Sequence, residues 1–210
     1  MIALIIGNGN DINKSIIDSI KYDYVVCADG GLEKAKNYGI TPDVIVGDFD
    51  SVDLSLLNEY EALNIPIMKF PAEKDYTDME LAAKFVLSKG FKDIVLIGAS
   101  GSRLDHTLGN IMLMEKYHKE GINISMIDNS NIIKVISDDS RLIVEFLENQ
   151  YVSIIPITEL EGLTLEGFKY PLNNVNVERG STLCISNEVI GKEGIITLSK
   201  GSALVFISKD

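Results

Sequence analysis

Short β-branched and aliphatic runs alternate with amphipathic segments through the first 127 residues of this chain. The runs predict strands, and the segments between them place their apolar residues on one helical face. The expected strands are residues 3–6, 24–28, 44–46, 66–70, 94–97 and 124–127, and the expected helices are residues 11–20, 32–38, 53–64, 77–87 and 108–117. Because strands separated by helices are joined by right-handed crossovers, this alternation predicts an open, mainly parallel α/β/α sheet.

The pattern changes at residues 128–130. The following segments are short, often alternating, and separated by turn residues, which is typical of a sandwich or barrel. The expected strands are residues 132–136, 141–146, 151–156, 163–165, 182–185, 195–198 and 203–207. The sequence therefore predicts an α/β plus all-β chain, with an α/β domain over residues 1–128 and a C-terminal β-sandwich over residues 129–210.

Composition narrows the classes of partner. The formal net charge is -12 and no cluster of Lys and Arg stands out, which argues against nucleic acid as the main partner. No run approaches the roughly 18 apolar residues of a membrane span. The first residues lack a basic leader, so we expect no signal peptide and a cytoplasmic location. Cys27 and Cys184 lie in apolar runs and are expected to be buried free thiols.

Acidic residues follow the expected strands at the point where those strands end. Asp29 follows one strand, and Asp48 and Asp50 follow the next. The carboxyl ends of parallel strands share one edge, where ligands bind, and alternate residues of an extended segment face the same side. Crowded carboxylates repel one another unless a cation lies among them, and hard oxygen ligands beside basic groups suggest Mg²⁺ with a polyphosphate. The alternative is a polar turn with its acids in solvent.

Residues 74–78 read Lys-Asp-Tyr-Thr-Asp at a predicted helix start. Capping and the helix dipole explain Thr77 and Asp78 without any function. They do not explain Lys74 and Asp75, which lie just outside the helix.

Two further loops suit a nucleotide. In residues 98–106, backbone N–H groups and Arg103 suit phosphate oxygens, whereas His106 is equally compatible with an ordinary helix-start residue. Residues 7–10 read Gly-Asn-Gly-Asn and lack the third glycine of a dinucleotide fingerprint. This segment is either a simple turn or a loop that approaches a nucleotide.

Taken in order, these motifs resemble the thiamine pyrophosphokinase family. They are Asp-Gly-Gly at residues 29–31, Gly-Asp-Phe-Asp-Ser at 47–51, Lys-Asp-x-Thr-Asp at 74–78 and Arg-x-Asp-His at 103–106, and the stretches at 167–172 and 180–188 are similar to the family's thiamine-binding domain. The resemblance implies transfer of pyrophosphate from ATP to the hydroxyethyl group of thiamine, giving thiamine diphosphate and AMP. It also implies a homodimer with active sites between subunits.

The resemblance also implies roles for individual residues. Mg²⁺ would be held by Asp48, Asp50 and Asp78, with Asp29 and Asp75 nearby. The phosphates of ATP would meet Lys74 and Arg103, in a site that includes Gly7, Asp105 and His106. Thiamine would be bound by Ser186, Asn187 and Asp29. Some members of the family stack thiamine on a Trp, but this chain has none, so any aromatic platform here must be a Tyr or a Phe.

Two other functions remain open from the residues alone. The acidic edge would also suit a Mg²⁺-dependent nucleotide phosphohydrolase, although that function leaves Ser186 and Asn187 unexplained. A nucleotide-sensing binding module is the non-enzymatic alternative, and it has no need of Lys74 and Arg103 beside clustered acids. If the chain is a transferase, Asp75 or Asp78 is the candidate base for the alcohol proton.

Overall fold

The computed structural model describes residues 1–50, 52–71, 73 and 75–210. The chain divides into two compact units, Met1–Asn129 (unit 1) and Ser130–Asp210 (unit 2). Among the described residues, no helix is long and apolar enough to cross a membrane. Cys27 and Cys184 are both buried free thiols, as predicted.

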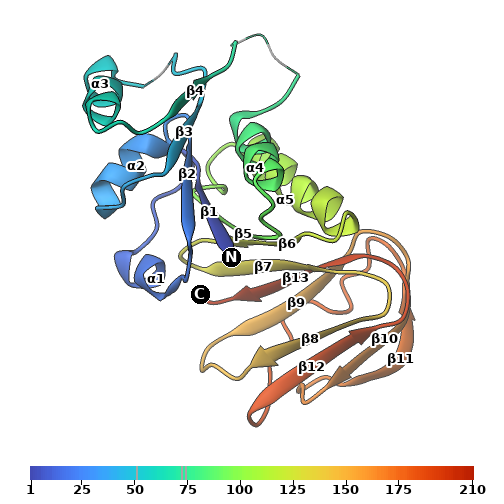
Figure 1. Cartoon of the computed structure of the whole chain (residues 1–210). Helices are drawn as coiled ribbons and strands as arrows, with labels where there is room; N and C mark the ends of the chain where they lie inside the picture. Colours follow the sequence, from blue (N-terminus) through green and yellow to red (C-terminus); the bar gives the residue numbers. More distant parts are fainter. Residues whose placement is uncertain (51, 72, 74) are drawn as a thin grey trace. The chain divides into compact units, whose positions relative to one another are not determined.

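Unit 1 contains a parallel sheet with strand order β4-β3-β2-β1-β5-β6 (Figure 1). The strands are β1 (Ile2–Ile6), β2 (Tyr24–Ala28), β3 (Val44–Gly47), β4 (Ile67–Lys69), β5 (Asp93–Ile97) and β6 (Asn123–Ile127). The helices are α1 (Lys14–Ser19), α2 (Gly31–Tyr38), α3 (Leu54–Ala62), α4 (Asp78–Ser88) and α5 (Leu104–Lys119). This confirms the predicted mainly parallel α/β architecture.

Helices cover both faces of this sheet, with α1, α2 and α3 on one side and α4 and α5 on the other (Figure 1). The central strands are therefore apolar at successive positions, and residues 3–6 of β1 are all 0% exposed. Since all six strands run the same way, the loops that leave their carboxyl ends share one edge. The acidic motifs lie on these loops.

Helix starts and ends follow local chemistry. The Thr77 hydroxyl caps α4 by accepting a hydrogen bond from the Glu80 N–H at 3.2 Å, as predicted, and α2 ends at Gly39 with a φ of 72°. In contrast, the predicted start of α5 at residue 108 was wrong, because the helix begins at Leu104. Its first residues are exposed, including Leu104, so the period of buried apolar residues does not reveal where the helix begins.

Unit 2 consists of two antiparallel sheets, with strand orders β7-β13-β9 and β11-β10-β12-β8. The strands are β7 (Asn131–Ile136), β8 (Ser140–Glu145), β9 (Tyr151–Pro156), β10 (Leu160–Glu166), β11 (Leu172–Val177), β12 (Glu193–Leu198) and β13 (Ala203–Ser208). Both sheets contribute side chains to one buried core, for example Val205 from the first and Ile196 from the second. Two sheets closed on a common core form a β-sandwich.

Two strand predictions in unit 2 were wrong. Residues 182–185 form a turn, within which the Cys184 carbonyl accepts a hydrogen bond from the Ile154 N–H at 2.9 Å. Isolated bridges follow at Asn187 and Val189. Strand β11 was missed because Leu172–Val177 contains three Asn residues, which are disfavoured in strands.

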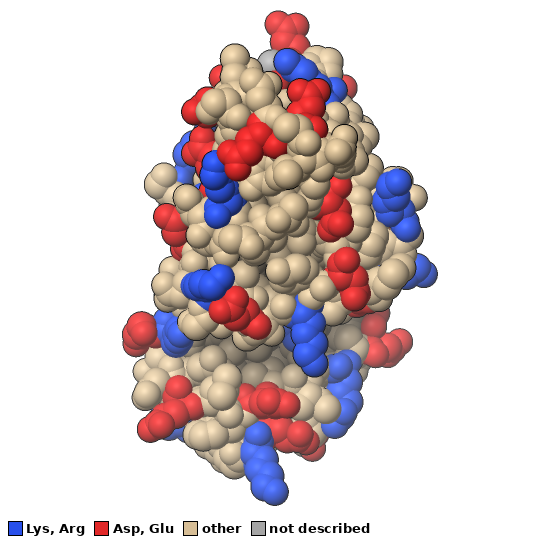
Figure 2. Space-filling model, turned by 60° about the vertical axis from the view of Figure 1, so that its left-hand side comes forward, with Lys and Arg blue, Asp and Glu red and all other residues tan. Residues whose placement is uncertain are grey.

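Charged side chains of both signs lie interspersed on the face drawn in Figure 2. The described residues also form ion pairs between opposite charges, such as Lys36 with Glu59 and Lys169 with Glu188. A mixed surface of this kind does not resemble the basic stripe with which proteins bind a phosphate backbone.

Candidate active site

Three carboxylates meet at the edge of the sheet where β2 and β3 end. One oxygen of each of Asp29, Asp48 and Asp50 lies within 4.8 Å of the others. The two loops approach closely because Gly47 has no side chain: a Cβ there would lie 3.0 Å from the Cα of Asp29. The structure thus brings together three of the acidic residues selected from the sequence.

Asp48 and Asp50 lie on the same side for a reason that the sequence did not reveal. The segment is not extended, because Phe49 has a φ of 62° and buries its ring in the core against α3. The Asp50 N–H donates to Oδ1 of Asp48 at 3.3 Å. A tight turn anchored by a buried aromatic ring therefore presents the two carboxylates, in place of the alternation expected along a strand.

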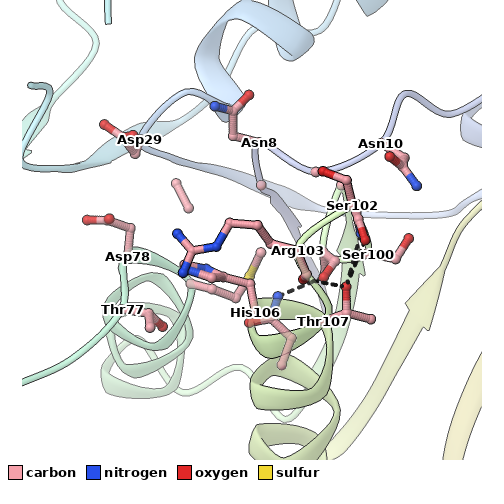
Figure 3. A pocket seen from close by; sticks show the side chains of 18 residues that line it. Asn8, Asn10, Asp29, Thr77, Asp78, Ser100, Ser102, Arg103, His106 and Thr107 are labelled. Atoms are coloured by element: carbon pink, nitrogen blue, oxygen red, sulfur yellow. Dashed lines mark hydrogen bonds between the residues drawn. The ribbon is translucent and has the colours of Figure 1, made fainter. Parts of the chain in front are cut away.

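The carboxylates of this cluster repel one another, and the repulsion raises a pKa. The Asp48 carboxylate is the main cause that raises the pKa of Asp50, and desolvation, Asp29 and Asp78 add to it. Asp78 is in the first turn of α4 and faces the same space as Asp29 in Figure 3. Carboxylate oxygens are hard ligands, and a divalent cation among them would remove the repulsion. The donor set therefore fits Mg²⁺.

A cavity of about 470 Å³ adjoins the carboxylates (Figure 3). Its walls are the loops after β1 and β5 and the first turns of α4 and α5. Of the residues selected from the sequence, Gly7, Asp29, Asp78, Arg103 and His106 all line it. A cavity with both acidic and basic groups can accept an anionic ligand together with its cation.

One wall of this cavity is made of backbone. The N–H groups of Gly7, Gly9 and Asn10 donate to the carbonyls of Ile97, Gly98 and Ser100, at 2.8, 2.6 and 2.7 Å. A Cβ on Gly9 would lie 2.1 Å from the Ser100 carbonyl oxygen, so only glycine permits this approach. These three N–H groups thus bind the neighbouring loop, which leaves Arg103 as a stronger candidate for phosphate than the first loop's amides.

Two hydrogen bonds to Asp105 fix the orientation of the Arg103 guanidinium. Its Nε and Nη2 donate to the two carboxylate oxygens of Asp105, at 3.2 and 2.6 Å. This interaction lowers the pKa of Asp105 to about 2. In Figure 3 the Arg103 side chain extends into the cavity above His106, which belongs to the exposed first turn of α5. Asp105 itself does not line this cavity; it restrains the guanidinium that does.

Of the pair Lys74 and Asp75, the structure describes Asp75, which is exposed. Asp75 precedes α4 and does not belong to the lining of the cavity. Lys74 lies outside the described residues.

Ser186 and Asn187 lie in unit 2, after the turn at residues 182–185. Asn187 is 4% exposed, and its side-chain amide is used internally: Oδ1 accepts from the Tyr170 N–H at 3.0 Å and Nδ2 donates to the Tyr170 carbonyl at 2.8 Å. Ser186 is exposed with a φ of 57°. Tyr170, which Asn187 holds, is 61% exposed.

Several polar residues of the cavity were not singled out from the sequence. They are Asn8, Asn10, Ser100, Thr107 and Asn110. Asn110 donates from Nδ2 to the Ala99 carbonyl at 2.8 Å, and the Thr107 hydroxyl accepts from the Gly101 N–H at 3.1 Å. The only sequence signal for them is their position in or next to the glycine-rich loops.

A family model matches each of the two units. The model described as "Thiamin pyrophosphokinase, catalytic domain" matches residues 19–126, and "Thiamin pyrophosphokinase, vitamin B1 binding domain" matches residues 130–203. The chain belongs to the thiamin pyrophosphokinase family. This confirms the resemblance that the ordered motifs indicated.

Individual members of the thiamin pyrophosphokinase family are similar to this chain in sequence and in structure. A thiamine pyrophosphokinase of Bacillus subtilis is 39% identical over 183 residues, covering 87% of this chain and 86% of the relative. A crystal structure of thiamine pyrophosphokinase from Bacillus subtilis superposes with a TM-score of 0.91 at 36% identity, covering all of both chains. The Candida albicans thiamin pyrophosphokinase, at 20% identity, shares the fold with a TM-score of 0.85 over 100% of this chain and 90% of that chain.

Proposed function

We propose that this chain transfers pyrophosphate from ATP to the hydroxyethyl group of thiamine, releasing AMP. The observation that carries the proposal is the meeting of Asp29, Asp48 and Asp50 beside a cavity that receives Arg103, in a chain of this family. Residues 1–128 are the ATP- and Mg²⁺-binding catalytic domain, and residues 129–210 are the thiamine-binding domain.

Asp48, Asp50 and Asp78 would hold Mg²⁺, with Asp78 contributed by the first turn of α4. The support is the raised pKa of Asp50, since a cation would stabilise the charged form that its neighbours destabilise. A metal held by these carboxylates would supply charge neutralisation at the phosphates, which otherwise repel an attacking oxygen. Asp29 completes the acidic group on the side where thiamine, a cation, approaches.

The cavity binds the triphosphate. Arg103, fixed by Asp105, meets phosphate oxygens through a guanidinium that is already oriented, so less side-chain freedom is lost on binding. His106 and Gly7 border the same space. In this proposal Lys74 also binds the phosphates. Phosphoryl-type transfer requires mainly positioning and electrostatic stabilisation, which these groups supply. Asp78 or Asp75 accepts the proton of the alcohol.

Thiamine binds the surface of unit 2 around Ser186 and Tyr170. Tyr170 is exposed, and the amide of buried Asn187 holds its backbone, so the ring lies on a restrained segment. An aromatic face attracts a cationic ring. Asn187 therefore contributes by holding this segment, Ser186 offers a hydroxyl, and Tyr170 takes the place of the missing Trp. The enzyme is a cytoplasmic homodimer whose sites combine unit 1 of one chain with unit 2 of the other.

The deciding experiment identifies the nucleotide product. The protein is incubated with ATP, Mg²⁺ and thiamine, and the nucleotides are separated. We expect AMP in equal amount to thiamine diphosphate, and little of either without thiamine or metal. ADP with thiamine monophosphate would indicate an ordinary kinase. Equal nucleotide hydrolysis without thiamine would indicate the phosphohydrolase, and no turnover despite binding would indicate a sensor.

A further inference from the structure

The last two residues of unit 1 hold the two loops that form the backbone wall of the cavity. We infer that Asp128 and Asn129, together called the boundary clamp, are positioning residues for the nucleotide. Neither side chain lines the cavity, and neither belongs to a motif identified from the sequence. The inference rests on the proposed binding of ATP in this cavity.

Asp128 holds the loop after β5. Its Oδ2 accepts a hydrogen bond from the Ser100 hydroxyl at 2.9 Å, and this contact is partly buried. Ser100 lines the cavity, and its carbonyl accepts the Asn10 N–H from the opposite loop. A displacement of Ser100 therefore moves both loops.

Asn129 holds the loop after β1. Its Oδ1 accepts from the Asn13 N–H at 2.7 Å, and its Nδ2 donates to the Asp11 carbonyl at 3.0 Å. Asp11 directly follows Asn8, Gly9 and Asn10, which line the cavity, and Asn13 lies two residues further on. The Asn129 amide thus uses both of its ends to fix the end of that loop.

The boundary clamp adds a further link to other interactions that hold these loops. The far end of the β1 loop is tied to α2, where Lys34 pairs with Asp11 at 2.7 Å and the Tyr38 hydroxyl accepts the Ile12 N–H at 3.1 Å. The two loops are tied to each other by backbone bonds. Asp128 and Asn129 connect this pair of loops to the end of β6, on the other side of β5. The clamp therefore fixes the wall relative to the sheet.

Loss of the boundary clamp should weaken the binding of the nucleotide but not that of thiamine. Without the clamp, the wall loops gain freedom that ATP binding must then remove, which weakens affinity without changing any group that touches the ligand. Thiamine binding, proposed to depend on unit 2, does not require this order. The expected result is a rise in the KM for ATP with little change in the KM for thiamine.

The test compares Asp128→Ala and Asn129→Ala with a matched control, Asn123→Ala. Asn123 is the first residue of β6, at the opposite end of the strand from the clamp. It also makes a side-chain hydrogen bond, donating to Asp93 Oδ1 at 2.9 Å. We expect each clamp variant to raise the KM for ATP about three- to tenfold, the effect of one or two lost hydrogen bonds. The control should leave both KM values unchanged.

Two further measurements separate positioning from general damage. Asp128→Asn retains a side-chain oxygen that can accept from Ser100, so it should restore the KM for ATP to near the wild-type value. Asp128→Ala combined with Ser100→Ala should be no worse than the more impaired single variant, because both remove the same hydrogen bond. Titration of each folded variant with a non-hydrolysable ATP analogue and Mg²⁺ measures binding directly.

Unchanged ATP affinity in both Ala variants would overturn the inference, as would equal increases in both KM values. An Asp128→Asn variant as impaired as Asp128→Ala would show that charge, and not the hydrogen bond, matters, and would also overturn it. If wild-type protein itself fails to bind the ATP analogue, the proposed function fails instead. The two failures are therefore distinguishable.

Discussion

At the scale of single residues, the main feature of the site is a cluster of carboxylates that repel one another. The pKa of Asp50 is raised mainly by Asp48, so the folded state holds a carboxylate in a position where its charged form is disfavoured. Such a group stabilises the folded protein at pH values below its unfolded pKa. That contribution is lost as the pH rises through its folded pKa. At neutral pH the metal-free protein therefore carries unrelieved repulsion.

Replacing Asp50 by Asn should remove this repulsion. We expect the metal-free Asp50→Asn variant to melt at a temperature equal to or above that of the wild type at neutral pH, with the difference vanishing in acid. Added Mg²⁺ should stabilise the wild type more than the variant, and activity should fall by orders of magnitude. Thermal melts with and without Mg²⁺ at several pH values measure this.

Asp53 supplies the control for that experiment. Its pKa is lowered, chiefly by the Ser55 N–H that it accepts at 2.8 Å, so its contribution to stability has the opposite dependence on pH. Asp53→Asn should therefore gain no stability at neutral pH and should keep the response to Mg²⁺. If Asp50→Asn gains as much from Mg²⁺ as the wild type, Asp50 does not bind the metal.

Tyr170 can be tested separately from the residue that holds it. Tyr170→Ala should raise the KM for thiamine and leave the KM for ATP unchanged, whereas Tyr170→Phe should retain most affinity because the aromatic face remains. Asn187→Ala should both raise the KM for thiamine and lower the melting temperature, since losing one buried hydrogen-bonded partner costs roughly 1–3 kcal/mol. A Tyr170→Ala enzyme with normal thiamine kinetics would exclude the ring from the site.

At the scale of elements, sequence periodicity was sufficient for the sheet of unit 1 but not for the loops. Strands buried on both faces are recognisable as apolar runs, and residues 24–28 were bounded correctly. The turn that presents Asp48 and Asp50 depends on a left-handed Phe49, which no local pattern revealed. The role of Asn187 depends on Tyr170, 17 residues away in sequence, so only the tertiary structure could expose it.

The glycine in the cavity wall gives a test at this scale. Gly9→Ala would place a Cβ 2.1 Å from the Ser100 carbonyl oxygen and 2.5 Å from that of Gly98, so the two loops must separate. We expect a destabilisation of about 1–3 kcal/mol and weaker ATP binding. Urea titration and measurement of the KM for ATP check both effects.

Gly109→Ala is the matched control for that substitution. Gly109 lies within α5, and a Cβ there meets nothing within 4 Å. Alanine is favoured over glycine in a helix, so this variant should be more stable by roughly 0.5–1 kcal/mol with unchanged kinetics. A Gly9→Ala protein as stable as the wild type would mean that the loops are not in the close contact described.

At the scale of the whole molecule, the division into an α/β unit and a sandwich could be read from the change in period near residue 129. The way in which two chains combine could not be predicted from the sequence, because the residues of an interface show no simple periodicity. The proposed homodimer is therefore best tested by complementation. Asp50→Asn impairs unit 1 and Tyr170→Ala impairs unit 2, so a mixed dimer with sites shared between chains would contain one intact site.

Mixing the two variants should restore activity after subunit exchange. The double variant Asp50→Asn/Tyr170→Ala, treated in the same way, should remain inactive. Verified exchange without recovery would instead place each site within a single chain.

The strand order of unit 2 has a consequence for how the protein is made. Strand β13 pairs with both β7 and β9, although it is the last strand of the unit to be synthesised. Unit 1 can fold on the ribosome as soon as it has emerged, because N-terminal domains generally fold first. Strands β7 and β9 must then wait with open edges until Ala203–Ser208 leaves the exit tunnel. During that interval the nascent sandwich exposes two unpaired strands, the kind of surface on which chains aggregate and chaperones act.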